Sequence, residues 1–172
     1  AAPAAKPAVS IDASNPFAKP STLPFQYPAF DKVKDEHFMP AFNAGMAQHL
    51  AEIEAIANNP KPATFENTIV AMEKSGDLLD RVSTFFFGVK GAHTNDAKDA
   101  IASEMSPKLA AHSDAIFLNA KLYSRIKSLY EKRDSLKLNA EQKHLLERYN
   151  TDFVRAGVKL SGADKEKLKS LN

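Results

Sequence analysis

Four prolines recur every four residues near the start of the chain, and no α-helix can continue through such a run. They are Pro16, Pro20, Pro24 and Pro28. Each removes one helix hydrogen bond and restricts the residue before it. Large apolar residues lie among them, which a disordered linker rarely carries: Phe17, Leu23, Phe25, Tyr27 and Phe30. We therefore expect residues 1–31 to form an extended arm, whose part from Asn15 to Phe30 docks its aromatic side chains against a folded body.

The proline-rich arm has a second interpretation, as a ligand for an SH3-type domain. Such ligands carry prolines in a PxxP pattern, which places them three residues apart. The spacing in this chain is one residue longer. The sequence therefore favours a structural role for the arm.

After Asp31 the apolar residues change to a helical period, and residues 32–172 are predicted to form a helical bundle. Steps of three and four residues place one stripe on the first helix: Phe42, Met46, His49, Leu50, Ile53 and Ile56. Pro40 suits the first turn of this helix. The run Asn58-Asn59-Pro60 is a typical helix stop.

A second helix is predicted to begin after Thr64, whose hydroxyl is a good N-cap. Its apolar stripe is long: Phe65, Ile69, Met72, Leu79, Val82 and Phe86. Gly76 is expected to bend or split it. From Leu78 to Val89 apolar residues occupy more than one face, including Phe85, Phe86 and Phe87. We expect this stretch to be the most buried element, with other elements packed against two of its sides.

Three further helices follow from the same period. Thr94 or Asn95 can cap the third, whose stripe includes Met105 and His112 and which Pro107 is expected to kink. The fourth and fifth have these apolar positions: Leu122, Ile126 and Leu129, then Leu145, Leu146, Tyr149 and Phe153. Asn139 caps the fifth, with Gln142 at the capping-box position.

The chain ends in a short helical segment that begins after Ser161, an N-cap residue. Only Leu168 and Leu171 are available for it to bury, which is weak anchorage for so short a helix. We expect the sequence to be cut from a longer protein. No run alternates with period two for long enough to be a strand. The predicted fold class is all-α, a bundle of about five to six helices preceded by the arm.

Composition is that of a soluble globular domain, with 44% hydrophobic and 26% charged residues among 172. The net charge of +2 does not indicate nucleic acid or a membrane as a partner. The absence of cysteine excludes disulfides and thiolate metal sites. No apolar stretch approaches the ~20 residues that span a bilayer. The Ala- and Pro-rich start resembles the remainder of a cleaved export signal, which predicts a periplasmic protein, with the cytoplasm as the alternative.

No catalytic signature is present in the sequence: there is no HExxH, GxSxG, Walker-type glycine loop or EF-hand loop. Two pairs of residues have a spacing that could bind a metal ion, His49 with Glu52 and His144 with Glu147. Ordinary surface hydrogen bonding is the favoured interpretation of both. His112 lies on an apolar stripe and is expected in the core. His37 and His93 lie near helix ends, where hydrogen bonding to the backbone is expected.

Several strings of the chain, taken in order, resemble the N-terminal region of bacterial peptidyl-dipeptidases. These are dipeptidyl carboxypeptidases of the thimet-oligopeptidase family of zinc metallopeptidases. The strings are NPF, LPFQYPAFDKVK, HFMPAF, EIEAIANNPKPATFENTIVAMEKSG, AHSDAIFLNAKLYSRI and RYNTDFVRAGVKLS. The resemblance covers essentially all residues from Asn15 to Asn172, and none of its strings is a catalytic signature.

The resemblance implies a longer, mostly helical parent enzyme that releases C-terminal dipeptides from short peptides. Its zinc would be held by an HExxH helix and a glutamate beyond Asn172, so no catalytic or metal-binding residue is assigned in this chain. The chain alone should be inactive. Its role would be to wall the substrate channel against folded proteins, with the missing catalytic part of the same polypeptide as its partner. Which residues would touch substrate is not indicated.

Two other functions remain open at this point. The chain could be a free-standing helical module for protein interaction. Its basic C-terminal half, from Asn119 on, would then contact an acidic partner, because Lys and Arg exceed Asp and Glu there by 13 to 7. It could also be a small metal-binding bundle that uses the two His/Glu pairs, His49 with Glu52 and His144 with Glu147.

Overall fold

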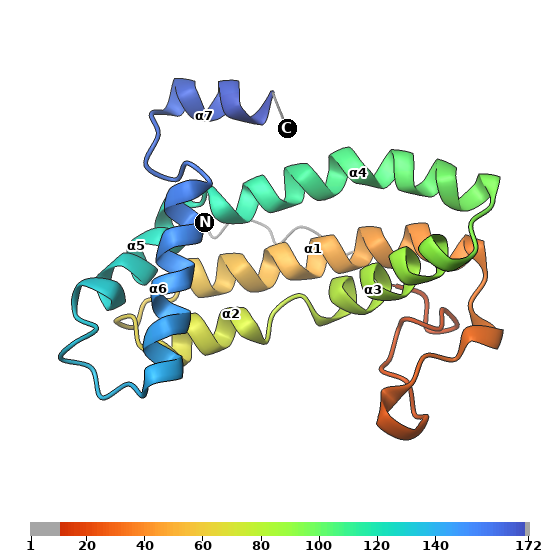
Figure 1. Ribbon diagram of the computed structural model, residues 1–172, viewed down its shortest axis with the longest axis horizontal. Coiled ribbons are helices and arrows are strands. Elements are labelled where there is room, and N and C mark those ends of the chain that lie inside the picture. The colour runs from red at the N-terminus through yellow and green to blue at the C-terminus, as the bar shows by residue number, and fades with distance from the viewer. Residues whose placement is uncertain (1–10, 171–172) are drawn as a thin grey trace, which may run out of the picture. The chain divides into compact units, whose positions relative to one another are not determined.

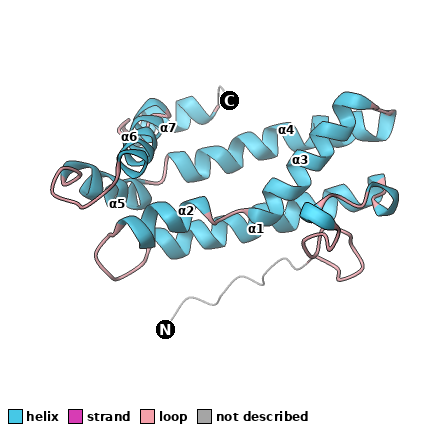
Figure 2. Cartoon of the chain, turned by 60° about the horizontal axis from the view of Figure 1, so that its bottom comes forward, coloured by secondary structure: helices cyan, strands magenta, loops and turns pink. Residues whose placement is uncertain are grey.

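The computed structural model describes residues 11–170, and within that range the fold is all-α, as predicted. Figure 1 follows the elements in order, and Figure 2 shows helices joined by loops, without a strand in the described part. The α-helices are α1 (Phe38–Ala57), α2 (Ala71–Glu73), α3 (Asp77–Ala92), α4 (Asp96–Phe117), α5 (Ala120–Glu131), α6 (Ala140–Arg155) and α7 (Gly162–Lys169). The short helical turns are η1 (Pro24–Gln26), η2 (Phe30–Lys32), η3 (Asp35–His37) and the π-helical η4 (Phe65–Val70).

The chain forms two compact units, and two helices belong to both. Unit 1 contains the residues up to His49 together with Gly76–Lys108, and unit 2 contains Leu50–Ser75 together with the residues from Leu109 onward. The unit boundaries fall inside α1 and α4. No helix within residues 11–170 is long and apolar enough to cross a membrane.

Unit 1 has an aromatic core formed by the start of α1 and by α3. Phe38 and Phe42 of α1 pack edge-on against Phe86 of α3, with ring centroids 4.9 and 5.4 Å apart. Such pairs add about 0.5–1.5 kcal/mol each to the free energy of area burial. Gly45 lets the two helices approach closely, because a Cβ there would lie 2.9 Å from the Leu79 Cα.

The start of α4 is held to η3 by an ion pair in unit 1. The buried ammonium of Lys98 lies 2.7 Å from a carboxylate oxygen of Asp35, and the Asn95 amide donates to the other oxygen at 2.9 Å. Asn95 also caps α4, since its Oδ1 accepts from the Lys98 backbone N–H. The hydrogen bonds from Lys98 and Asn95 hold the pKa of Asp35 below its usual value.

Unit 2 is built around an aliphatic core to which η4, α5 and α6 contribute. Its fully buried members include Ile69, Ile126 and Leu146. Phe153 of α6 packs against Phe117, with ring centroids 5.1 Å apart. The predicted N-caps are confirmed, because Thr64, Asn139 and Ser161 each accept the backbone N–H three residues on.

Several details of the helices differ from the sequence-based expectation. The segment after Thr64 is wound as a π-helix before it becomes α-helical at Ala71. Gly76 splits the second predicted helix rather than bending it, and its φ is +79°. The helix α4 continues through Pro107. The kink expected there stays a prediction.

The stretch from Leu78 to Val89, which was expected to be the most buried element, has one exposed phenylalanine. Phe85 and Phe86 are buried, but Phe87 is 44% exposed. Successive residues of a helix point about 100° apart, so three in a row require neighbours on most sides. In unit 1 the rings of Phe85 and Phe86 are covered and that of Phe87 is not.

Two expectations concern residues outside the described range. The export signal was inferred from the first residues, and residues 1–10 are not described. Leu171, one of the two apolar residues expected to anchor the last helix, is not described either. The other, Leu168, lies in α7, which contains no buried residue.

Candidate functional site: the cavity between the arm and α3

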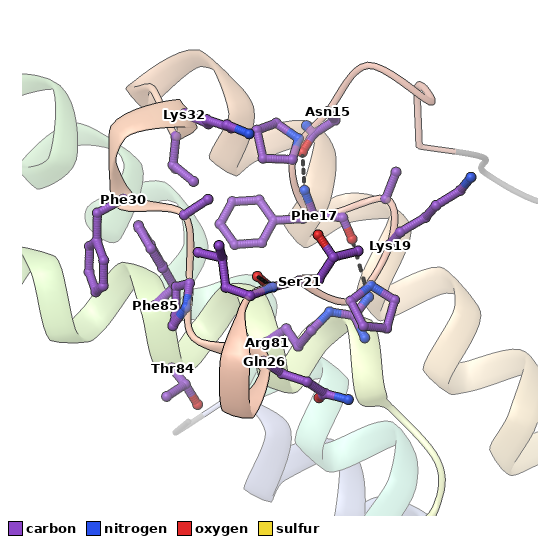
Figure 3. A pocket seen from close by; sticks show the side chains of 18 of the residues that line it. Asn15, Phe17, Lys19, Ser21, Gln26, Phe30, Lys32, Arg81, Thr84 and Phe85 are labelled. Atoms are coloured by element: carbon purple, nitrogen blue, oxygen red, sulfur yellow. Dashed lines mark hydrogen bonds between the residues drawn. The ribbon is translucent and has the colours of Figure 1, made fainter.

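A cavity of about 820 Å³ opens in unit 1 between the arm and one face of α3. Residues 13–33 form one wall and residues of α3 form the other (Figure 3). Its apolar lining includes Phe17, Phe30, Val33, Phe85 and Val89. A cavity of this size and character is typical of a small-molecule site, for which ~300–1,000 Å³ is usual.

One buried aromatic ring, that of Phe17, anchors the first part of the arm at the cavity. Phe17 is 6% exposed, and its ring centroid lies 5.9 Å from that of Phe38 and 5.5 Å from that of Phe85. Asn15 fixes the backbone beside it, since its Oδ1 accepts from the Phe17 N–H and its Nδ2 donates to the His37 carbonyl. These contacts confirm that the arm docks through Phe17.

Arg81 of α3 ties the same point of the arm to the helix. Its Nη2 donates to the Phe17 carbonyl at 3.2 Å, and its other terminal nitrogen pairs with Asp77 one turn away. The Nε of Arg81 is buried and has no hydrogen-bond partner among the described residues. Figure 3 shows Arg81 on the α3 side of the cavity, with Phe17 near its middle.

The second part of the arm lies at the mouth of the cavity, and there the expectation that all aromatics dock is wrong. Leu23, Phe25 and Tyr27 are 45%, 104% and 62% exposed. Phe30 packs on Phe85 with ring centroids 4.8 Å apart, yet it stays half exposed. The chain reverses direction too tightly here for these side chains to reach the body.

The tight reversal is visible in the backbone of η1. Phe25 and Gln26 both have a φ of +56°, a left-handed conformation that is a genuine outlier for a bulky side chain. The Ser21 hydroxyl closes the loop by donating to the Tyr27 carbonyl at 2.7 Å. Within the arm, residues 21–27 therefore form a tight closed loop.

The lining is suited to binding and carries no arrangement for nucleophilic catalysis. Its ionisable residues within the described range are Lys19, Lys32, Asp80 and Arg81. Hydroxyls line it as well, but no histidine that could activate them is among the lining residues.

The histidines considered from the sequence are not among the residues that line this cavity. No group of three or more His, Asp or Glu side chains within residues 11–170 could hold a metal ion. Glu147 instead lies 3.6 Å from the Arg133 guanidinium, and His144 is exposed. The metal-binding alternative, which needs His49, Glu52, His144 and Glu147 together, is therefore not supported.

The remaining histidines match their expected structural roles. His112 is buried in α4, at 8% exposed. His37 accepts the Lys34 N–H on its Nδ1 at 2.9 Å, which caps η3. His93 is the C-cap of α3.

Two long-range contacts in unit 2 were not predicted from the sequence. Arg125 of α5 donates to the carbonyls of Asn59 and Lys61 at 2.9 and 3.0 Å, and to Asn67 Oδ1 at 2.8 Å. Tyr149 of α6 donates to a carboxylate oxygen of Glu73 at 2.5 Å. Each joins residues more than 50 positions apart, and no local pattern signals such a pair.

No protein-family model matches the chain. Its sequence is similar to that of individual characterised proteins. It is 46% identical over 158 residues to the dipeptidyl carboxypeptidase of Escherichia coli strain K12, and 43% identical over 159 residues to that of Salmonella typhimurium strain LT2. It is 26% identical over 153 residues to the oligopeptidase A of Escherichia coli.

These matches cover most of this chain and a small part of each relative. They include 92% of the chain for the two dipeptidyl carboxypeptidases and 86% for oligopeptidase A. The chain spans about a quarter of the length of these relatives, 23% and 21% respectively. The relatives are peptidases several times longer, and the resemblance seen in the ordered strings is confirmed. The chain is homologous to the N-terminal region of bacterial dipeptidyl carboxypeptidases, relatives of oligopeptidase A in the thimet-oligopeptidase family.

Proposed function

We propose that this chain is the non-catalytic N-terminal helical part of a zinc metallopeptidase that releases C-terminal dipeptides from short peptides. The observation that carries the proposal is the 46% identity to a dipeptidyl carboxypeptidase over 92% of the chain. Identity of this level over so long a stretch supports the proposal that the chain has the same fold and the same place in a parent protein.

The role proposed for this part is to form one wall of the substrate channel and so to restrict the size of the substrates that enter it. Two features of the chain support it. The helices α1 and α4 have 20 and 22 residues, which makes each about 30 Å long. Each unit has its own packed core, so within a unit the helical segments are held firmly in place. A wall of firmly held helical segments suits the exclusion of folded proteins.

The zinc of the proposed enzyme would be bound outside this chain. Zinc in a catalytic site takes three protein ligands, usually His, Glu or Asp. The described residues offer no such group, and the whole sequence has no cysteine and no HExxH. In this proposal no residue of this chain takes part in the chemical reaction. Its proposed partner is the catalytic part of the same polypeptide.

A chimera tests the proposal directly. This chain replaces the matched segment of the Escherichia coli dipeptidyl carboxypeptidase, with the isolated 172-residue chain as the comparison. The chimera is expected to bind one zinc ion and release dipeptides from short blocked peptides. It is also expected to spare a folded protein. The isolated chain is expected to do none of these.

Two results would contradict the proposal. A chimera that folds and binds zinc but releases no dipeptide would show that this chain does not belong in that position. A chimera that releases dipeptides and also degrades a folded protein would leave the place in the enzyme intact and refute the channel-wall role.

A further inference from the structure

The cavity between the arm and α3 has an apolar interior that nothing in the proposed peptidase role uses. Phe17, Phe30 and Phe85 supply aromatic surface, and Val33 and Val89 supply aliphatic surface. In Figure 3 the ring of Phe17 lies near the middle, with Phe30 and Phe85 to one side of it. Burying apolar groups of a ligand here would be favourable because it removes apolar surface from water.

The rim of the cavity is cationic. Lys19 and Lys32 line it and are exposed, and their ammonium groups have no hydrogen bond or ion pair with any other described residue. Arg81 adds a third cation, which Asp77 partly neutralises and whose Nε is buried without a partner among residues 11–170. Asp80 is the one carboxylate among the described lining residues. The rim therefore favours an anion.

We propose that this cavity binds a small apolar carboxylate. The hydrocarbon or aromatic part of the ligand lies against the phenylalanines, and its carboxylate lies at the rim beside one of the two lysines, which Figure 3 shows on different sides of the cavity. Two natural sources supply this chemistry, a fatty acid and the free C-terminus of a short apolar peptide. The inference rests on the cavity alone and does not depend on the proposed peptidase role.

Gly88 offers a way to fill the cavity without harming the fold. It lies in α3 and lines the cavity, and a Cβ at this position would meet nothing within 4 Å. Gly88→Leu therefore places a side chain into open space. Replacing a helical glycine also raises the helix propensity of α3, so a loss of ligand binding is not expected to come from unfolding of this helix.

Gly91 provides the matched control. It lies three residues further along the same helix, is equally open to a Cβ, and is not among the residues that line the cavity. Gly91→Leu changes helix propensity in the same way and leaves the cavity empty. The pair separates an effect on the cavity from an effect on the helix.

The experiment is isothermal titration calorimetry on the full 172-residue chain. The probes are decanoate and N-acetyl-Phe-Phe with a free carboxylate, each compared with its uncharged amide. We expect at least one carboxylate to bind saturably and its amide to bind at least about fivefold more weakly, because the amide lacks the charge. Gly88→Leu should abolish binding and Gly91→Leu should keep it. Lys19→Met/Lys32→Met should weaken binding about five- to tenfold.

The source of the ligand follows from which probe binds. Binding of decanoate alone identifies a fatty acid, and binding of the dipeptide alone identifies a peptide C-terminus. The inference is overturned if neither carboxylate binds, if the amides bind equally well, or if Gly88→Leu and Gly91→Leu bind alike. Because the chimera assay does not use this cavity, failure here leaves the proposed peptidase role to be judged separately.

Discussion

At the scale of single residues, the contact between Tyr149 and Glu73 has the clearest chemical consequence. The Tyr149 hydroxyl donates to the Glu73 carboxylate at 2.5 Å, joining α6 to α2. Burial of the phenol raises the pKa of Tyr149 well above its ordinary 10.0, and the hydrogen bond to Glu73 raises it further. Both causes favour the neutral phenol, since a phenolate would be desolvated and would face a carboxylate.

This shift predicts a loss of stability in alkali. The folded-state pKa exceeds that of the unfolded chain, so the contribution of Tyr149 is fully present below pH ~10. It is lost as the pH rises above that value, by up to ~1.4 kcal/mol for each pH unit. In Tyr149→Phe the free energy of unfolding should be lower by about 1 kcal/mol at pH 8, because exposed Glu73 is screened by water.

The measurement is urea denaturation of both proteins from pH 8 to pH 11.5. The other tyrosines are present in both, so the difference between the two curves isolates Tyr149. The variant should lose stability less steeply above pH 10, and the two curves should converge. Parallel curves across the whole range would show that the ionisation of Tyr149 is not linked to folding.

Residues that act on their own neighbours could be predicted from the sequence, and residues that act at long range could not. Thr64, Asn139 and Ser161 cap helices through the N–H three residues on, a geometry that local sequence specifies. Arg125 and Tyr149 bind groups 58 or more positions away. Which arginine meets which carbonyl depends on the packed fold, and one sequence carries no local signal for it.

At the scale of elements, Gly76 separates α2 from α3. Its φ of +79° lies in the left-handed region, which glycine adopts without steric cost. A Cβ at this position would also lie 2.9 Å from Nδ1 of His49 and 3.0 Å from two ring carbons. The break between the helices therefore depends on the absence of a side chain.

Gly76→Ala is expected to lower the free energy of unfolding by about 1–3 kcal/mol. The left-handed conformation costs an alanine ~1–2 kcal/mol, and displacement of the His49 ring adds to that. Gly91→Ala is the control, because Gly91 is helical and open to a Cβ, and it should stabilise by up to ~1 kcal/mol. Thermal and urea denaturation measure both. Equal effects of the two substitutions would mean that Gly76 tolerates a side chain.

Helix positions could be predicted because they follow from the spacing of apolar residues and from the residues that cap or end helices. Which side chains are buried at the edge of the core could not be predicted. The stripe on α1 and the stop at Asn58 match the structure. The sequence did not indicate that Phe87 would be exposed, because a third consecutive apolar residue looks buried whatever its neighbours. It also did not predict the cavity, since that space lies between residues 13–33 and α3 and depends on how the two pack in the folded chain.

At the scale of the whole molecule, the chain consists of two units that share the helices α1 and α4. Each unit has its own buried side chains, aromatic in unit 1 and mainly aliphatic in unit 2. The exposed apolar residues are concentrated in the arm of unit 1, with Phe25 fully exposed and Tyr27 62% exposed. Several large exposed apolar side chains in one short segment are typical of a contact with another protein surface.

This surface predicts the behaviour of the isolated chain in solution. If the arm contacts the remainder of a parent enzyme, its aromatics are uncovered when the chain is alone. The chain should then bind an apolar fluorescent dye and associate as its concentration rises. The double substitution Phe25→Ser/Tyr27→Ser should reduce both effects and leave ligand binding in the cavity unchanged, because neither residue lines it.

Dye titration and sedimentation velocity over about a hundredfold range of concentration would measure these effects. Leu160→Ser is the control, since Leu160 is 43% exposed in unit 2 and lies outside the arm. It should associate as the unchanged chain does. A chain that stays monomeric and binds no dye would contradict the prediction. It would also weaken the view that this helical part needs a catalytic partner. Apolar surface that a missing partner leaves uncovered is unfavourable in water and promotes association, so a chain that does not associate has no such surface to cover.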